Sequence, residues 1–293
     1  MADRVAFRPC AARRTASPEA PRCHNPASFA CVVVVSALCV YPIKSCRGIQ
    51  VQKWPIAARG FVADRRWMIV DASGTFVTQR ERAELSLVGT ALEGEKLRLT
   101  APGMPEFELP LTHESGESCQ VKVWQDLALG VPHARGSAWF SDYLRARHEL
   151  VYMPEHHHRR VNPARAKPSD IVSFADAYPF MLISEASLAD LNARLEKPIT
   201  MDRFRPNIVI GGCEPFTEDS YTRVRIGEIA FRGPKRCERC VVTTIDPITG
   251  AGGQEPLRTL AKYRLDNQQV WFGMNLIHDN EGVLQVGDAV EIG

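Results

Sequence analysis

Short segments rich in β-branched and aromatic residues recur between residues 60 and 123, each bounded by turn residues. The pattern predicts five strands, at 62–70, 75–79, 96–100, 107–110 and 119–123. The sequence Asp71-Ala-Ser-Gly74 supplies the turn of a hairpin between the first two. Regular spacing of short strands is typical of antiparallel pairing. This part of the chain is therefore constrained to an antiparallel β unit.

The remainder of the chain alternates further strands with a few helices. Strands are predicted at 29–40, 149–153, 178–183, 221–226, 228–232, 241–245, 270–277, 282–286 and 289–292. Three helices are predicted, at 136–147 with Ser137 as N-cap, at 184–195 with Ser184 as N-cap, and at 256–263. Because strands outnumber helices, the expected fold class is mainly β with α, that is α+β.

Length, charge and cysteine content restrict the class of protein. A chain of 293 residues has room for one large or two ordinary domains. Hydrophobic residues make up 45% and charged residues 24%, which is normal for a globular protein. The net charge of +2 favours no polyanion, so no nucleic-acid partner is expected. Nine cysteines at irregular spacing do not suggest a disulfide framework, so we expect a reducing compartment and a cytoplasmic location.

The N-terminal segment at 1–28 differs from the rest. It is rich in Ala, Arg, Pro and Ser without apolar periodicity, which predicts a disordered leader or a misassigned start. The longest apolar run, at 29–41, has about a dozen residues, whereas a helix that spans a membrane needs roughly 20. A signal peptide is disfavoured because Cys39-Val-Tyr-Pro42 is no small-residue cleavage site. No membrane span is therefore expected.

The segment 235–250 holds the most reactive group of side chains. Cys237 and Cys240 lie three positions apart, among the cations Lys235, Arg236 and Arg239. Fixed positive charge favours the thiolate, which is the form that binds a metal or acts as a nucleophile. The run 241–245 predicts a strand and 246–250 predicts a turn. The two thiols are thus predicted at the entrance to a strand.

Three interpretations of this Cys-x-x-Cys pair follow from the residues themselves. A zinc site would need about two more ligands, and the sequence contains no second Cys-x-x-Cys. A dithiol redox site of the thioredoxin kind would need the pair to open a helix, whereas a strand is predicted here. Two buried thiols that serve only packing are the third interpretation, and the surrounding cations fit it poorly.

Two other basic stretches are candidate binding segments. Pro42 and Gly48 bracket a loop in which Lys44, Ser45 and Arg47 supply cationic and hydroxyl donors suited to a phosphate. The loop 154–168 contains three consecutive histidines and several cations. Three adjacent histidines cannot all point one way, so we expect a mobile basic loop at the rim of a site rather than a metal site. A solvated turn and a solvated loop are the alternatives.

Several separated motifs resemble the MOSC-domain proteins that carry an N-terminal MOSC β-barrel domain, a family named after the C-terminal domain of molybdenum-cofactor sulfurase. They are Tyr-Pro-Ile-Lys-Ser-Cys-x-Gly at 41–48, Asp-Arg-x-Trp at 64–67, Ser-Glu-Ala-Ser-Leu at 184–188, Arg-Phe-Arg-Pro-Asn-Ile-Val at 203–209, and Cys-x-Arg-Cys with Thr-Thr and Asp-Pro-x-Thr-Gly at 237–250. The motifs at 184–209 are similar to the mitochondrial amidoxime-reducing component and its bacterial relatives. The resemblance covers about residues 31–293.

The resemblance implies an N-terminal, barrel-like β domain at 29–130 and a C-terminal MOSC β-barrel with a few helices at 131–293. The molybdenum cofactor, molybdenum bound to molybdopterin, would lie in the cleft between them, with Cys240 as the metal ligand and catalytic residue. The other cofactor-binding residues that it implies are Lys44, Ser45, Arg65, Asp176, Arg205, Asn207 and Arg239.

The same resemblance suggests what these side chains do. Lys44, Arg65 and Arg205 would neutralise the terminal phosphate of the cofactor, and Asp176 and Asn207 would hydrogen-bond the pterin. Ala177 departs from the family, which often has a hydroxyl residue there. One pterin contact is therefore expected to be missing.

The implied activity is molybdenum-dependent reduction of small N-hydroxylated compounds: amidoximes, hydroxamic acids and N-hydroxylated bases. A separate flavoprotein reductase, with or without a haem or iron–sulfur carrier, would supply electrons, since no cysteine follows Cys240. Pyridoxal phosphate is not an expected cofactor. The alternative function is a molybdenum-cofactor carrier or sulfur-transfer protein without N-reductase turnover. A zinc-stabilised β protein that binds a partner is a further alternative.

Overall fold

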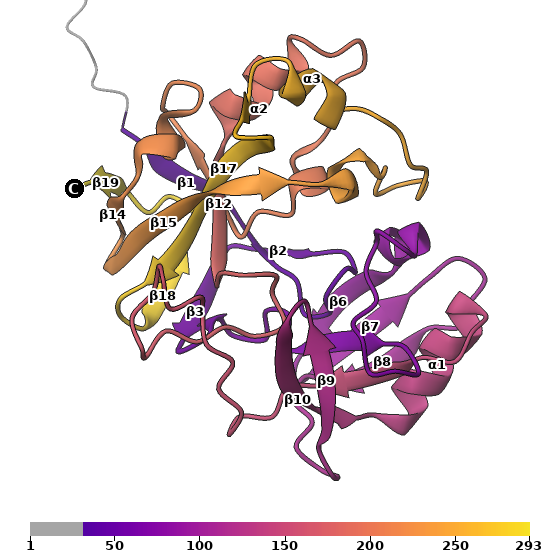
Figure 1. Cartoon of the computed structure of the whole chain (residues 1–293). Coiled ribbons are helices and arrows are strands. Elements are labelled where there is room, and N and C mark those ends of the chain that lie inside the picture. Colours follow the sequence, from indigo (N-terminus) through magenta and orange to yellow (C-terminus); the bar gives the residue numbers. More distant parts are fainter. Residues whose placement is uncertain (1–31) are drawn as a thin grey trace, which may run out of the picture. The chain divides into compact units, whose positions relative to one another are not determined.

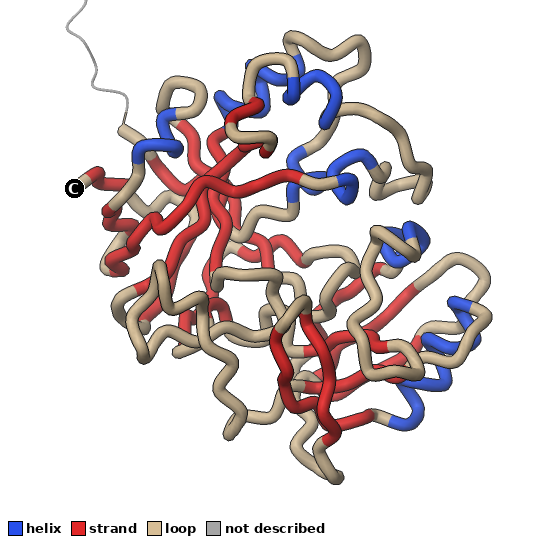
Figure 2. Tube along the Cα trace, in the orientation of Figure 1, coloured by secondary structure: helices blue, strands red, loops and turns tan. Residues whose placement is uncertain are grey.

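The structure is a computed structural model, and it describes residues 32–293. The predicted leader at 1–28 and the first residues of the strand predicted at 29–40 lie outside this range. Within it, strands dominate the regular structure, and the helices are short and lie at the margins of the strands (Figure 2). The predicted fold class, mainly β with a few helices, is confirmed.

A nine-stranded sheet is built mainly from the second half of the chain (Figure 1). Its spatial order is β19 (Val290–Ile292), β14 (Arg223–Ile226), β15 (Ile229–Arg239), β17 (Gln269–His278), β12 (Phe180–Ser184), β13 (Ile208–Gly211), β1 (Val34–Val40) and β2 (Ile49–Val51), and β16 (Leu265–Asp266) pairs with β17. Strands β12 and β13 run parallel, and the segment that joins them contains helix α2 (Glu185–Asn192). A parallel pair needs such a crossover connection.

Strand β19, at one end of this sheet, meets the start of β1, next to the other end. Val34, at the start of β1, forms a bridge with Ala289, just before β19. The Val290 amide also donates to the Val33 carbonyl oxygen at 2.8 Å. The sheet therefore closes on itself as a barrel through β1 and β19. Buried apolar residues from its strands, among them Leu38 and Phe180, pack into one hydrophobic core.

Two smaller antiparallel sheets are built from the part of the chain between residues 67 and 152. One has the order β5 (Trp67–Val70), β11 (Glu149–Tyr152), β10 (Asp126–Pro132) and β9 (Cys119–Val123), and the other is β6 (Gly89–Glu93), β7 (Lys96–Thr100) and β8 (Phe107–Pro110). Helix α1 (Ala134–Leu144) packs its buried residues Trp139, Phe140 and Leu144 into the core of these sheets. The antiparallel β unit predicted from the spacing of short segments is confirmed, with β7, β8 and β9 at the predicted residues.

A third small sheet joins early strands to a late one. Strand β3 (Lys53–Ala57) pairs with β4 (Gly60–Phe61) on one side and with β18 (Gly282–Gln285) on the other. Together with the pairing of β1 with β13, this places the first strands of the described chain in sheets with its last ones. The division into domains at residue 130 stays a prediction.

The helices begin where local hydrogen bonds place them. Ser184 caps α2 as predicted, because its Oγ accepts from the Ser187 amide at 3.0 Å. The N-cap predicted at Ser137 is wrong: His133 caps α1 by accepting from the Gly136 amide, and Ser137 Oγ instead accepts from the Leu150 amide. The remaining helices are α3 (Leu257–Ala261) and the 3-10 turns η1 (Ala83–Leu87), η2 (Met201–Phe204), η3 (Thr217–Ser220) and η4 (Val241–Thr244). None of the helices within residues 32–293 has the length and hydropathy that a membrane crossing requires.

The strand predicted at 62–70 is interrupted. Residues 62–65 form a turn between β4 and β5, with left-handed backbone angles at Ala63 (φ 67°) and Arg65 (φ 49°). Two bonds tie this turn to Tyr41, whose amide donates to Asp64 Oδ1 at 2.8 Å and whose carbonyl oxygen accepts from the Arg65 amide at 2.7 Å. Tertiary hydrogen bonds here override the β propensity of the segment.

Candidate functional site

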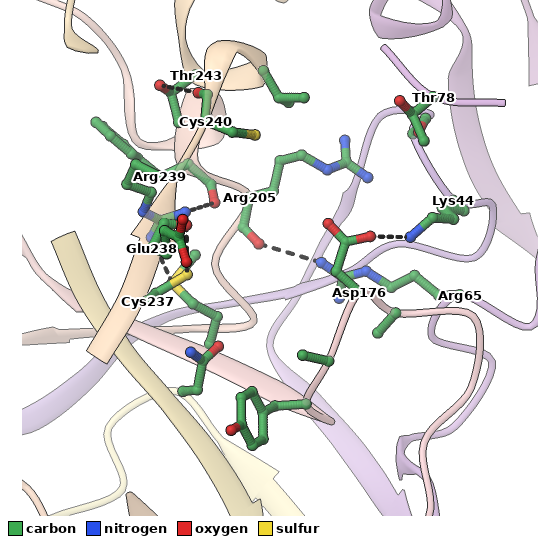
Figure 3. A pocket seen from close by; sticks show the side chains of 18 of the residues that line it. Lys44, Arg65, Thr78, Asp176, Arg205, Cys237, Glu238, Arg239, Cys240 and Thr243 are labelled. Atoms are coloured by element: carbon green, nitrogen blue, oxygen red, sulfur yellow. Dashed lines mark hydrogen bonds and ion pairs between the residues drawn. The ribbon is translucent and has the colours of Figure 1, made fainter. Parts of the chain in front are cut away.

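A cavity of about 430 Å³ lies beside the C-terminal end of β15. Sites for small molecules are typically in the range of roughly 300–1,000 Å³. All eight residues assigned to the cofactor site from the sequence line this one cavity: Lys44, Ser45, Arg65, Asp176, Arg205, Asn207, Arg239 and Cys240. Figure 3 labels Lys44, Arg65, Asp176, Arg205, Arg239 and Cys240 among them. The structure thus brings together residues that are spread over almost two hundred positions of the sequence.

Cys240 follows β15 directly and precedes the 3-10 turn η4. The strand predicted at 241–245 is therefore wrong, and the two thiols end a strand rather than begin one. Threonine hydroxyls explain the difference, because Thr243 Oγ1 donates to the Cys240 carbonyl oxygen at 3.0 Å (Figure 3) and Thr244 Oγ1 donates to that of Val241 at 2.7 Å. Such local bonds compete with strand pairing, so the β-branched run turns at the wall of the cavity.

Arg80 joins the two sides of the cavity, and the sequence analysis did not identify it. Its Nη2 donates to Cys240 Sγ at 3.3 Å and lies 3.4 Å from Asp176 Oδ2. Its guanidinium stacks over the ring of Trp124 at 4.7 Å from the ring centroid. The polar triplet Thr78-Gln79-Arg80 follows a strand-like segment as Lys44 and Ser45 do, and this similarity is the signal that could have found it.

Asp176 presents a carboxylate to the cavity. It forms an ion pair with Lys44, which it faces in Figure 3, and it accepts from Trp124 Nε1 at 3.3 Å. Partial burial acts to raise the pKa of Asp176, but the charges of Lys44 and Arg80 outweigh it and lower that pKa below its ordinary value. About half of the Asp176 side chain is exposed, at 50%, so an ionised hydrogen-bond acceptor is available to a ligand.

Lys44 lies behind this carboxylate. Its side chain is almost fully buried, and its Nζ also donates to the Phe174 carbonyl oxygen at 2.9 Å. Burial lowers the pKa of Lys44, and the ion pair with Asp176 opposes that effect. The Lys44–Asp176 ion pair is therefore partly shielded from water, and it fixes the position of the Asp176 carboxylate at the cavity wall.

Arg159, in the predicted mobile basic loop, binds the backbone of the segment that carries Asp176. Arg159 is only 5% exposed, so it is not a surface cation of a mobile loop, and that expectation is wrong for this residue. Its Nη1 donates to the carbonyl oxygens of Ser173 and Ala175, and it also forms an ion pair with Asp126. A buried guanidinium needs several hydrogen-bond acceptors, and the loop that contains Ser173 and Ala175 supplies two of them. Its neighbours in the basic loop at 156, 158 and 160 are exposed.

Two cations stack on one buried ring at the back of the cavity. The guanidinium carbons of Arg65 and Arg205 lie 4.2 and 4.4 Å from the centroid of the Tyr41 ring. Arg65 also forms an ion pair with Asp64 at 2.5 Å, whereas Arg205 Nη1 donates to the Cys46 carbonyl oxygen at 2.6 Å. Within the described residues no carboxylate lies within 4.0 Å of the Arg205 guanidinium. Its charge is available to an anionic group in the cavity.

Asn207 acts behind Arg65 and is almost fully buried. Its Nδ2 donates to Asp64 Oδ1 and to the Cys39 carbonyl oxygen at 3.2 Å each, and its Oδ1 accepts from Arg65 Nη1 at 3.0 Å. Burial is the main cause that raises the pKa of Asp64 above its ordinary value, against the charge of Arg65. Asn207 therefore holds the Asp64–Arg65 pair in place at the cavity wall.

Arg239 fixes the end of β15 next to Cys240. Its Nε donates to the Phe272 carbonyl oxygen at 2.7 Å and its Nη1 donates to that of Phe204 at 3.0 Å. Cys237 packs with the apolar cluster that contains Phe272, and burial raises the pKa of its thiol. The two cysteines of the Cys-x-x-Cys pair thus have different surroundings, with only Cys240 in contact with Arg80.

Left-handed backbone angles concentrate around the cavity. Nine non-glycine residues within 32–293 have a positive φ, and four of them line it: Ser45 (71°), Arg65 (49°), Trp124 (56°) and Arg205 (57°). Each such residue costs on the order of 1 kcal/mol or more, and such costs cluster at functional sites. The strain marks the cavity as a site independently of its charges.

The described residues hold no second set of metal ligands. No group of three or more His, Cys, Asp or Glu side chains within residues 32–293 could hold a metal ion. Cys46 packs in the buried hydrophobic cluster that contains Trp67, and burial raises the pKa of its thiol to about 12.

Two family models match most of the chain. The family model described as the MOSC N-terminal beta barrel domain matches residues 32–147, and that of the MOSC domain matches residues 169–291. Among solved structures, a YuaD protein from Bacillus subtilis has 12% identity and a TM-score of 0.41, and covers 88% of this chain and 94% of that one. That likeness is too weak to bear on function.

Two mammalian proteins are similar over most of their length. The mitochondrial amidoxime-reducing component 1 of Homo sapiens is 34% identical over 280 residues, which is 88% of this chain and 82% of that protein. The mitochondrial amidoxime reducing component 2 of Rattus norvegicus is 37% identical over 285 residues, 88% of this chain and 83% of that protein. The chain therefore belongs to the MOSC family, with an N-terminal MOSC barrel domain followed by a MOSC domain.

Proposed function

We propose that the protein is a molybdenum-cofactor-dependent oxidoreductase that reduces small N-hydroxylated compounds: amidoximes, hydroxamic acids and N-hydroxylated bases. The names of its relatives, amidoxime-reducing components, support this class of reaction. The observation that carries the proposal is the position of the Cys240 thiol in a cavity that the Asp176 carboxylate also lines. The cations Lys44 and Arg205 line the same cavity.

The donors around the cavity fit a molybdenum–molybdopterin group. Cys240 would supply the thiolate ligand, because soft thiolates suit such metals and Arg80 adds a positive charge at 3.3 Å from its sulfur. Lys44, Arg65 and Arg205 would neutralise the terminal phosphate. Ser45 lines the same cavity, and its hydroxyl would add a donor.

The hydrogen bonds refine the roles of three other residues. Asp176 would accept hydrogen bonds from pterin N–H groups, since its carboxylate stays ionised. Asn207 would contribute chiefly by holding Arg65, because three of its hydrogen bonds go to protein groups. Arg239 would hold the Cys240 segment at the required position, because its Nε and Nη1 bind carbonyl oxygens.

The reaction balances with two electrons and two protons. In an amidoxime the N–O bond breaks, one proton adds to the nitrogen to give the amidine, and the other adds to the departing OH, which leaves as water. The bound cofactor supplies the metal that passes the electron pair. The protein binds and orients the N–OH group at the Cys240 side of the cavity and supplies fixed charge around it, which is how an active site stabilises charge that develops in a reaction.

A separate protein would deliver the electrons. We propose a flavoprotein reductase, with or without a haem or iron–sulfur carrier, as the donor. Turnover with NADH or NADPH and no second protein would contradict this. The cytoplasmic location stays a prediction, and the relatives described above are named as mitochondrial.

Elemental analysis tests the site. Molybdenum and zinc per chain are measured in the wild type, Cys240→Ser and the matched control Cys237→Ala, all purified from a host that makes the molybdenum cofactor. We expect molybdenum near one per chain in the wild type and in Cys237→Ala, with metal or its thiolate absorption lost in Cys240→Ser. Zinc in place of molybdenum, or equal loss in both variants, would contradict the assignment of Cys240.

Turnover separates the proposal from its alternative. The wild-type holoprotein is reduced with a chemical mediator and supplied with benzamidoxime, and the amidine formed is measured. Stable molybdenum binding without amidine formation, for this and for a hydroxamic acid, would favour a cofactor carrier or a sulfur-transfer protein. The partly buried Cys237 thiol, whose pKa is raised, is a poor candidate for carrying a persulfide.

A further inference from the structure

Trp124 occupies a position that neither its hairpin nor the hydrophobic core requires. It is the first residue of the two-residue turn between β9 and β10, since Val123 pairs with Asp126. Its φ of 56° lies in the left-handed region, which costs a bulky side chain about 1–2 kcal/mol and favours Asn or Gly. Its side chain is 43% exposed, so burial of the ring offsets only part of that cost. Strain of this kind is an indication of function.

The indole is nonetheless held from three directions. The Phe76 ring lies against it with the centroids 5.1 Å apart, and the Arg80 guanidinium lies 4.7 Å from its centroid. Its Nε1 donates to Asp176 Oδ1 at 3.3 Å. A ring that is fixed in orientation and half exposed at a cavity wall can stack with a ligand at little entropic cost.

Arg80 extends this surface to the thiol. Its planar guanidinium lies over the Trp124 ring and reaches Cys240 Sγ at 3.3 Å with Nη2. A ligand group that lies near Cys240 therefore has the guanidinium and then the indole beside it. Both groups favour planar π systems, the indole by stacking and the guanidinium by cation–π contact.

We infer that Trp124 and Arg80 form a substrate-side wall that selects N-hydroxylated compounds with a planar aromatic or heteroaromatic group. This inference rests on the proposed function and deepens it by naming the substrate class. The ring of the substrate lies against the Arg80 guanidinium and the exposed part of the Trp124 ring while its N–OH group lies toward Cys240. An alkyl analogue has the same N–OH group without the π face, so it forgoes the stacking contact.

Binding to the oxidised holoprotein tests the inference without turnover. Dissociation constants of benzamidoxime and acetamidoxime are measured by calorimetry for the wild type, Trp124→Asn and Trp124→Phe. We expect the wild type to prefer the aryl compound. Trp124→Asn removes the ring and should weaken benzamidoxime roughly twofold to tenfold, as expected for one aromatic contact, while acetamidoxime changes little. Trp124→Phe should keep most of the preference.

The Asn variant also separates folding from selectivity. Asn relieves the strain of the left-handed turn position but loses the ring contacts with Phe76 and Arg80, so the thermal midpoint of Trp124→Asn should stay close to that of the wild type. Leu127→Ala is the matched control, because Leu127 lies on the same hairpin, is 60% exposed and is not among the cavity residues. It should change neither dissociation constant.

The outcomes distinguish this inference from the proposed function. Equal affinity of the wild type for both compounds, no binding of either, or equal weakening of both in Trp124→Asn would overturn the inference. Selective binding of benzamidoxime without any amidine formation would support the aromatic wall while rejecting the reductase proposal. Amidine formation without aryl preference would reject only the wall.

Discussion

The carbonyl oxygen of Asp176 accepts a hydrogen bond from Arg159 Nη2 at 3.2 Å, so a buried cation from one loop holds the backbone of a cavity carboxylate in another. The same guanidinium binds the Ser173 and Ala175 carbonyl oxygens. The position of the Asp176 side chain therefore depends on a residue that does not line the cavity.

Replacement of Arg159 by Lys should disturb the site through Asp176. Lysine keeps the charge but not the fork of donors that reaches three carbonyl oxygens. We expect a loss of roughly 2–4 kcal/mol in the free energy of unfolding, measured with denaturant, because buried acceptors lose their partner. We also expect lower molybdenum content. Arg160→Gln is the control, since Arg160 is exposed, and it should change both quantities little.

A double-mutant cycle distinguishes positioning from simple loss of stability. Arg159→Lys is combined with Asp176→Asn, and molybdenum retention is measured in all four proteins. If Arg159 acts through Asp176, the effects on retention should be clearly less than additive. Additive effects would show that Arg159 contributes to the fold alone.

The free energy of unfolding of the apoprotein should depend on pH in the acid range because of Asp176. The folded state lowers the pKa of this carboxyl below the ordinary value of about 3.9, so its stabilising contribution is complete above that pH. The contribution is lost as pH falls through the lower, folded pKa. The difference in unfolding free energy between the wild type and Asp176→Asn should therefore be constant above about pH 5 and shrink below about pH 4. A difference that grows on acidification would contradict the direction of the shift.

Gly233 should tolerate no side chain. A Cβ at this position would lie 1.8 Å from the Tyr221 carbonyl oxygen, in the irregular stretch of the β15–β17 pairing between Arg232 and Lys235. Gly233→Ala should lower the free energy of unfolding by at least about 2 kcal/mol, since neither backbone can yield without losing hydrogen bonds. In Gly252→Ala the new Cβ meets nothing within 4 Å. That control should be neutral or stabilising by up to about 1 kcal/mol.

Loss of the Ser184 hydroxyl should weaken the start of α2. Ser184 Oγ accepts from the Ser187 amide and donates to Ser187 Oγ, both of which are buried. Ser184→Ala should cost about 1–2 kcal/mol in urea denaturation. Ser73→Ala, in an exposed turn, should stay within about 0.5 kcal/mol of the wild type, and an equal cost in both would contradict the capping role.

Much of the strand framework could be predicted from the sequence because its signals are local. Strands β7, β8 and β9 are each bounded by turn residues, and the cap at Ser184 needs only the amide three positions later. The strand predicted at 241–245 is wrong for a reason that is also physical. Its β-branched side chains suit a strand, but its threonine hydroxyls bind preceding carbonyl oxygens and turn the chain.

The cavity residues that carry motifs were found, whereas those without a motif were missed. Arg80 meets Cys240 across 160 positions and Asp176 across 96, and no periodicity relates such residues. Arg159 lay in a polar, histidine-rich loop that has the composition of a solvated surface. Its burial depends on acceptors supplied by residues 173–176, which only the folded chain brings to it.

The pairing of early with late strands has a consequence for dividing the chain in two. Gly116 and Glu117 lie in an exposed loop, and a break there would leave β1, β3 and β5 on one fragment and their partners β13, β18 and β11 on the other. Neither fragment would contain all the strands of the barrel or all the residues of the cavity. When the two fragments are coexpressed, the complete cavity forms only if they associate. The fold is therefore suited to a fragment-complementation experiment.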